Sequence, residues 1–131
     1  LRDWGKMFDW KDVQEVHLFH IIKKVITPLE FGLVELPDEE TYQQMKKPLE
    51  ELFHNEAKNI LPHFKGQKVF HIEAAFDPEE ESINLLKKIN ADLVVVATQG
   101  KKGFEGFFHH SFTDYLVKFA PCDLYVVRPK S

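Results

Sequence analysis

Short apolar runs alternate along the chain with longer amphipathic segments. The short runs have strand length and are rich in β-branched and aromatic residues; they lie at residues 15–22, 67–75, 92–98 and 124–127. The longer segments place apolar side chains at helical spacing; they lie at residues 38–61, 78–90 and 112–120. Strands that alternate with helices predict parallel pairing through βαβ units. We therefore expect an α/β fold, an open, mostly parallel twisted sheet with helices on both faces.

Several residue types mark where these helices begin and end. Asp77 and Pro78 are favoured at the cap and first position of a helix, and Asn90 can end it in the left-handed conformation. Ser111 is a good N-cap for the last helix. At the start of the chain, residues 1–8 carry Leu, Trp and Phe on one helical face, so a further helix is expected there.

Two stretches break the regular pattern. Residues 27–37 contain two prolines and a glycine, and we interpret them as a connecting segment. Pro48 lies inside the helical stripe of residues 38–61. Because an interior proline costs about 3 kcal/mol, either the regular helix begins near residues 47–48 or it kinks at Pro48.

Composition narrows the functional classes. The 131 residues fit one domain, and 44% hydrophobic with 29% charged residues is typical of a globular protein. Seventeen basic against 21 acidic residues give a net charge of −4, which disfavours nucleic acid and anionic membranes as partners. The longest apolar run covers only residues 93–97, too short to span a bilayer. The single cysteine, Cys122, favours a reducing, cytoplasmic compartment.

Catalytic motifs are scarce. The sequence contains no P-loop lysine motif, no GxSxG and no HExxH. We interpret Cys122 as a small buried hydrophobe, because it follows a proline at the start of a strand. The neighbours His109 and His110 have no third metal ligand at a useful spacing, so no metal site is expected. His17 and His20 should face opposite sides of one strand.

A glycine-rich loop follows the strand at residues 92–98. Gly100 and Gly103 lie in it, and Ser111 then opens the last helix. Backbone N–H groups in such a loop, beside a helix N-terminus, can bind an anion. A loop that only turns the chain explains the same residues about equally well.

The sequence resembles the universal stress protein family over essentially its whole length. The resemblance is carried by ADLVVVATQG at residues 91–100, by residues 111–128 with their Ala-Pro-Cys followed by a Val-Val-Arg strand, and by EVHLFHII at residues 15–22. Some members of this family bind ATP and others do not. The family acts in stress responses and signalling, so the resemblance implies a stress-response function.

The nucleotide-binding members carry Gly, two residues, Gly, nine residues, Gly, then Ser or Thr. The matching positions here are Ala97, Gly100, His110 and Ser111, so the spacing is kept but only one of three glycines remains. The resemblance further implies that Ile21 and Val96 line an adenine and ribose pocket and that Phe112 flanks Ser111. Gly103 and Gly106 lie inside the nine-residue stretch and can supply alternative flexibility. We expect weak or absent ATP binding, with a small anion still possible at Ser111.

The family also begins with a central strand that bears Pro-x-Asp. No such strand precedes the helix at residues 1–8. Losing a central strand would leave two half-sheets with unpaired backbone groups. We therefore expect residues 1–131 to form a single domain that lacks the family's first strand, and the native chain to extend upstream of Leu1.

The hypothesis that follows is a non-enzymatic, cytoplasmic homodimer in stress response or signalling. Its dimer contact would be the terminal strand from Leu124 to Arg128, because an apolar edge strand needs cover and pairs with a second copy about a two-fold axis. One alternative is a functional ATP-binding member with slow nucleotide hydrolysis. Another is a protein-interaction module that uses three aromatic residues at helical spacing: Phe104, Phe107 and Phe108. Packing of these aromatics on the domain's own core is the simpler explanation.

Overall fold

The computed structural model describes residues 2–97 and 110–128. These residues separate into two compact units, residues 2–78 and the part from residue 79 onward. The expectation that residues 1–131 form a single domain stays a prediction. Among the residues described, no helix combines the length and apolar character that a membrane span requires.

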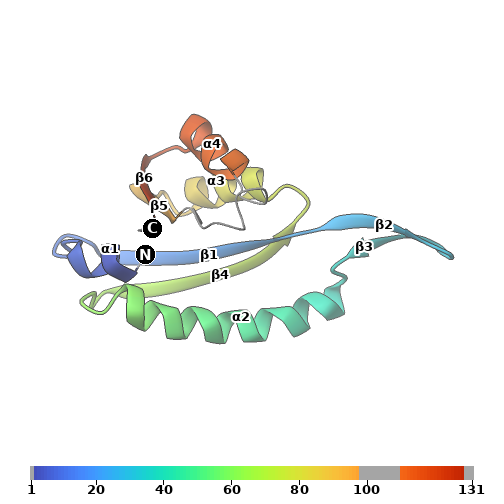
Figure 1. The fold of residues 1–131 in the computed structure, drawn as a ribbon, viewed down its shortest axis with the longest axis horizontal. Helices are drawn as coiled ribbons and strands as arrows, with labels where there is room; N and C mark the ends of the chain where they lie inside the picture. The colour runs from blue at the N-terminus through green and yellow to red at the C-terminus, as the bar shows by residue number, and fades with distance from the viewer. Residues whose placement is uncertain (1, 98–109, 129–131) are drawn as a thin grey trace. The chain divides into compact units, whose positions relative to one another are not determined.

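A pair of long parallel strands organises residues 2–78 (Figure 1). β1 (Glu15–Lys23) pairs with β4 (Gln67–Ala75) over nine residues, in a register that places Glu15 beside Gln67. Both strands were predicted from their apolar runs, and parallel pairing is confirmed. Successive side chains along each strand point in opposite directions, so even-numbered and odd-numbered side chains lie on opposite faces of the pair.

The predicted first helix is α1 (Arg2–Met7). It packs on the end of a longer helix, α2 (Glu39–Ile60), and its Gly5 is buried there. A cluster of aromatic rings holds this end of the unit, with Trp10 lying 5.4 Å from Phe64 and 4.6 Å from Phe8 between ring centroids. The indole N–H of Trp10 also donates to the Gly5 carbonyl oxygen at 2.9 Å.

Residues 27–37 do not form the connecting segment that we expected. They belong to an antiparallel hairpin made of β2 (Val25–Leu29) and β3 (Gly32–Leu36). β-branched residues favour the extended strands, and Gly32 at φ 128° supplies the backbone conformation that the turn needs. The two prolines do not prevent strand formation here, because proline is tolerated at the outer edge of a strand and just after its end.

α2 begins at Glu39, nine residues before Pro48, so the alternative of a helix starting near residues 47–48 is wrong. The start is fixed by Asp38, whose carboxylate accepts a hydrogen bond from the Thr41 N–H at 2.8 Å. Further along, the Tyr42 hydroxyl donates to the Ile72 carbonyl at 2.6 Å and ties the helix to β4. These contacts offset the one helical hydrogen bond that Pro48 cannot make.

The core of this unit lies between α2 and the even-numbered face of the strands. Ile22 and Ile72 are buried there, and Ala57 of α2 is also buried. Phe70 contacts both Phe53 and His54 of the helix, at ring-centroid distances of 6.3 and 4.3 Å. The opposite face of β1 and β4 therefore carries the odd-numbered side chains.

The second unit contains the other parallel pair. α3 (Pro78–Lys88) is followed by β5 (Leu93–Ala97), α4 (His110–Phe119) and β6 (Asp123–Val127), and β5 pairs with β6 in parallel. Ile83, Leu86, Val94 and Leu116 supply its core, with Leu116 only 1% exposed. Asn90 has φ 55° and ends α3 in the left-handed conformation, as predicted.

The α/β class is therefore confirmed, with parallel strand pairs connected by helices. In the described parts of the chain these strands form three two-stranded sheets: β1–β4, β2–β3 and β5–β6. The antiparallel hairpin was not expected from the sequence pattern.

Candidate functional site

The predicted nucleotide motif brackets the connection between β5 and α4. Ala97 is the last residue of β5 and pairs with Val127, and Val96 precedes it on the strand. Val96 is half-buried and Ala97 is exposed. Parallel strands present ligands at their carboxyl ends, so these two residues lie where a ligand of this fold class would bind.

The other end of the motif lies at the start of α4. His110 is the first residue of this helix and Ser111 the second, so the prediction that Ser111 is the N-cap is wrong by one or two residues. The helix therefore begins earlier in the sequence than an N-cap at Ser111 would place it. Gly100, Gly103, Gly106, His109 and the aromatics Phe104, Phe107 and Phe108 lie outside the described residues.

α4 is anchored by its apolar face. Leu116 is almost fully buried, and the rings of Tyr115 and Phe119 contact each other at 4.6 Å between centroids. Phe112, which the resemblance places beside Ser111, is half-buried in the first turn. The packing of Leu116 fixes the direction of the helix and thereby the place of its first turn in this unit.

Cys122 lies between α4 and β6 and is half-buried. Burial raises the pKa of its thiol, and the carboxylates of Asp123 and Asp92 raise it further. A raised pKa keeps the sulfur as a neutral thiol at neutral pH, and the thiolate is the nucleophilic form. The structure thus supports the interpretation of Cys122 as a packing residue.

Ile21 lies in the other unit. It stands on the odd-numbered face of β1, directly beside Glu73 of β4, and it is half-buried. The predicted site residues are therefore divided: Val96, Ala97, His110, Ser111 and Phe112 belong to the β5–α4 unit, and Ile21 belongs to the β1–β4 unit.

A hydrogen-bonded chain of side chains occupies the same odd-numbered face as Ile21. His17 Nδ1 lies 2.8 Å from His71 Nε2, and His17 Nε2 lies 3.0 Å from a carboxylate oxygen of Glu15. The two imidazole planes differ by only 11°, with centroids 5.1 Å apart. Because two ring nitrogens approach so closely, the rings meet edge to edge in one plane and are not stacked face to face.

This chain fixes the histidine tautomers. An ionised Glu15 only accepts hydrogen bonds, so His17 Nε2 carries the proton. In neutral His17 the Nδ1 atom is then an acceptor, and His71 Nε2 must be the donor. The odd spacing of His17 and His20 predicted opposite faces, and the structure has His17 hydrogen-bonded on the odd-numbered face and His20 exposed on the other.

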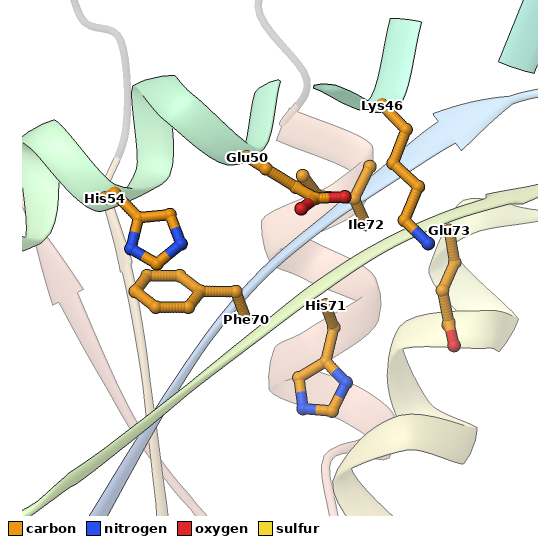
Figure 2. A pocket seen from close by; sticks show the side chains of 7 residues that line it. All are labelled: Lys46, Glu50, His54, Phe70, His71, Ile72 and Glu73. Atoms are coloured by element: carbon orange, nitrogen blue, oxygen red, sulfur yellow. The ribbon is translucent and has the colours of Figure 1, made fainter. Parts of the chain in front are cut away.

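A cavity of about 430 Å³ lies along the edge of β4 beside α2 (Figure 2). It is lined by side chains from both elements: Lys46, Glu50, His54, Phe70, His71, Ile72 and Glu73. Figure 2 shows Phe70 directed toward His54 of α2 and His71 directed away from that helix. The cavity therefore reaches around the strand edge and meets both faces of β4.

The charge of this cavity does not suit a nucleotide triphosphate. One lysine faces two glutamates, and phosphate oxygens would meet the carboxylates of Glu50 and Glu73. Glu73 Oε2 is buried and accepts no hydrogen bond from the described residues. A small polar molecule with a donor group fits this lining better than a polyanion does.

The residues that line this cavity were not predicted from the sequence. A signal was present in β4, where the apolar Phe70 and Ile72 alternate with the polar His71 and Glu73. That period of two indicates a strand with one polar face. Within the described residues, no group of three His, Cys, Asp or Glu side chains is arranged to hold a metal ion.

Comparisons with a family model and with curated proteins agree on one family. The model of the universal stress protein family matches residues 14–128. A relative from Staphylococcus aureus (strain USA300) that is assigned to the universal stress proteins is 31% identical over 109 residues, which is 82% of this chain and 64% of that protein. A second such relative, from strain NCTC 8325 / PS 47, gives the same values. The chain thus spans slightly less than two thirds of the length of these curated relatives.

Two solved structures share the fold. A universal stress protein family protein from Arabidopsis thaliana, determined with AMP bound, has a TM-score of 0.59 and 17% sequence identity, covering 99% of this chain and 76% of that chain. The hypothetical protein MJ0577 has the same TM-score and 20% identity, covering 99% of this chain and 86% of that chain.

Proposed function

The chain belongs to the universal stress protein family, and from this we propose that it is a non-enzymatic, cytoplasmic protein of stress response or signalling. We further propose that its ATP binding is weak or lost. The proposal is carried by the residue types at the two ends of the β5–α4 connection, where the nucleotide motif has its first and third glycine positions. Alanine stands at the end of β5 and histidine at the start of α4, where the nucleotide-binding members have glycine.

Backbone N–H groups beside a helix start bind phosphate only if the phosphate can approach the main chain closely. Glycine permits that approach, and a side chain at the same position obstructs it. Ala97 adds a single methyl group, which is a small change. His110 adds an imidazole at the first residue of α4, and a neutral imidazole supplies no charge to compensate a triphosphate.

Restoring the glycines tests this proposal. We expect calorimetric titration with ATP and Mg²⁺ to give no binding to the wild type at sub-millimolar concentration and measurable binding to the double variant Ala97→Gly/His110→Gly. His109→Gly is the matched control, since it removes the neighbouring imidazole without restoring a motif glycine. Micromolar binding of ATP to the wild type would show that the site is functional.

A functional nucleotide site is the second candidate. The AMP in the Arabidopsis thaliana structure favours it, because that protein shares the fold. In this case Gly103 or Gly106 would replace the lost motif glycines, and slow hydrolysis would release phosphate from ATP. Phosphate release above background from the purified wild type, lost in a Ser111→Ala variant, would favour this candidate over the first.

We propose that the chain is not a catalyst because it lacks an evident set of catalytic side chains at the β5–α4 connection. Phosphoryl transfer needs a group that orients or deprotonates the attacking water, together with charge stabilisation. Lys101 and Lys102 alone would not suffice, and the raised pKa of Cys122 argues against a thiolate nucleophile. A pure protein-interaction function through Phe104, Phe107 and Phe108 stays an alternative hypothesis.

We also propose that β6 forms a homodimer contact. β6 pairs with β5 along one edge, and no strand of the described residues covers its other edge. Tyr125 and Val126 of this strand are 51% and 38% exposed. Antiparallel pairing with β6 of a second copy would cover the edge and satisfy two-fold symmetry. The expected effect of Val126→Asp is a lower mass in light scattering.

A further inference from the structure

The β2–β3 hairpin exposes an unusual number of large apolar side chains. In Figure 1 it extends beyond the ends of α2 and of the β1–β4 pair. Six large side chains of residues 25–36 are between 38% and 81% exposed: Val25, Ile26, Leu29, Phe31, Leu33 and Leu36. Exposed large apolar side chains gathered on one element are typical of an interaction site.

The exposed residues lie on both faces of the hairpin. Residues that pair across the two strands share a face, so one face carries Val25, Thr27, Leu29, Val34 and Leu36, and the other carries Ile26, Pro28, Leu33 and Glu35. Within the described residues, neither strand packs extensively on any helix or strand other than its hairpin partner. Because an isolated two-stranded hairpin is marginally stable in water, added strands would stabilise this one.

The two outer edges of the hairpin differ in their hydrogen-bonding groups. The two-residue turn joins Leu29 and Gly32, and hydrogen-bonded pairs alternate with non-hydrogen-bonded pairs from there. Ile26 and Pro28 on β2, and Leu33 and Glu35 on β3, therefore direct their backbone groups outward. Pro28 has no N–H, so the β2 edge lacks a donor, whereas the β3 edge retains both.

We propose that β3 pairs with β3 of a second copy of this chain, antiparallel about a two-fold axis at Val34. In this register Leu33 faces Glu35 of the second copy, and Glu35 faces its Leu33. The backbone N–H and C=O groups of Leu33 and Glu35 in both copies then all form hydrogen bonds. The two Val34 residues face each other as a non-hydrogen-bonded pair. The product is a four-stranded antiparallel sheet with β3 strands at its centre.

The charges of the hairpin permit this pairing. Glu35 is the only charged residue of β3, and in the proposed register it faces a leucine instead of the other Glu35. It also forms an ion pair with Lys24 of its own chain at 2.9 Å. Within β3 no like charges are directly opposed across the axis, and the pairing of the two strands is self-complementary as two-fold symmetry requires.

The size of the surface sets the expected strength. Residues 25–36 number fewer than the roughly 20–30 residues that each side of a standard interface contributes. We therefore expect a reversible dimer with a dissociation constant in the micromolar range. This contact is separate from the proposed β6 contact, and a chain that uses both would form species larger than a dimer.

Proline substitution at either member of one cross-strand pair removes an outward-pointing N–H from one edge of the hairpin and so distinguishes the two edges. Glu35 and Ile26 face each other, and each N–H points out of the hairpin. In the Val126→Asp background, sedimentation across the micromolar range should show a monomer–dimer equilibrium. Glu35→Pro should weaken it at least tenfold, and Ile26→Pro should leave it unchanged. Glu35→Gln, which removes only the ion pair, should also leave it largely unchanged.

The outcomes separate this proposal from the β6 proposal. A strictly monomeric Val126→Asp variant, or dimers that survive Glu35→Pro, would overturn pairing through β3. If instead Glu35→Pro alone makes the otherwise wild-type chain monomeric, the β6 contact is refuted and the hairpin contact stands.

Cross-linking gives a second measurement that tolerates a weak dimer. Non-hydrogen-bonded antiparallel pairs have Cα atoms about 4.5 Å apart, within the range that a disulfide bridges. With Cys122 replaced by serine, Val34→Cys should form a disulfide-linked dimer on mild oxidation. Thr27→Cys, its partner within the hairpin, is the control and should not. Equal cross-linking of both variants, or of neither, would overturn the proposed register.

Discussion

At the scale of single residues, Gly5 shows how one missing side chain permits a helix contact. A Cβ atom built on Gly5 would overlap the backbone carbonyl of Ile60, so α1 lies against α2 only because residue 5 is glycine. In the sequence, glycine inside a helical pattern lowers helix propensity and gives no sign of a tertiary contact. Close packing of two helices explains its presence there.

We predict that Gly5→Ala destabilises the chain. Alanine gains about 1 kcal/mol of helix propensity, but overpacking against main-chain atoms costs about 1–3 kcal/mol or more. The free energy of unfolding should therefore fall, by about 1–2 kcal/mol, in a denaturant titration followed by the fluorescence of Trp4 and Trp10. Lys6→Ala, at an exposed neighbouring position, is the control. A Gly5→Ala variant as stable as the wild type would show that α1 does not pack there.

The histidine chain on β1 and β4 makes a prediction about proton positions. At slightly alkaline pH, His17 should carry its proton on Nε2, facing Glu15, and His71 should carry one on Nε2, facing His17. Long-range proton–nitrogen correlation by NMR assigns both tautomers. Glu15→Ala should release the preference at His17. Finding His17 protonated on Nδ1 in the wild type would contradict the arrangement.

At the scale of the elements, the start of α2 depends on its cap. Hydrogen bonds from Thr41, from its side chain and from its backbone N–H, hold the pKa of Asp38 below its ordinary value. A lowered pKa means that the folded state favours the ionised carboxylate. The stability that this contributes is present above the pKa of the unfolded chain, about 3.9, and is lost as the pH falls through the folded value.

We therefore predict that the advantage of the wild type over Asp38→Asn shrinks on acidification. Asparagine keeps the accepting oxygen but carries no charge, so the two proteins should differ at neutral pH and converge as the pH falls through the lowered folded-state pKa of Asp38. Thermal unfolding of both proteins at a series of pH values measures this difference. Asp38→Ala lacks the acceptor altogether and should be the least stable of the three at neutral pH. A difference that grows on acidification would contradict the sign of the pKa shift.

Most elements were predictable because local pattern and tertiary packing agree. The bounds of β4 were predicted correctly, and α3 begins where Pro78 follows Asp77. The hairpin was missed because Pro28 looks like a strand breaker until the register shows its nitrogen on the outer edge. The alternative of a shorter α2 was wrong because the cost of Pro48 is visible in the sequence, whereas the contact between Tyr42 and β4 is not.

The candidate site was predictable only in part. The structure places Ala97 at the end of β5 and His110 at the start of α4, and their role as nucleotide-motif positions stays a prediction. The cavity beside α2 was not predicted, because its lining joins His54 to His71, residues that only the fold brings together. Sequence spacing cannot reveal such pairs unless a known motif connects them.

At the scale of the whole molecule, family membership and the proposal of weak or lost ATP binding rest on different parts of the sequence. The family match covers residues 14–128, while the glycines that permit phosphate approach are replaced at two of three motif positions. Neither contact surface proposed for a second copy, β6 or the hairpin, uses the nucleotide motif. Association of copies should therefore not depend on added ATP.

Native mass spectrometry of the purified protein tests the central claim most directly. The spectrum is recorded for the protein as isolated and again after addition of Mg²⁺ and ATP at sub-millimolar concentration. We predict that the mass of the chain and of any assembly corresponds to protein alone in both samples. A stoichiometric ATP or AMP adduct in the protein as isolated, or one that saturates on addition, would contradict the proposal that ATP binding is weak or lost.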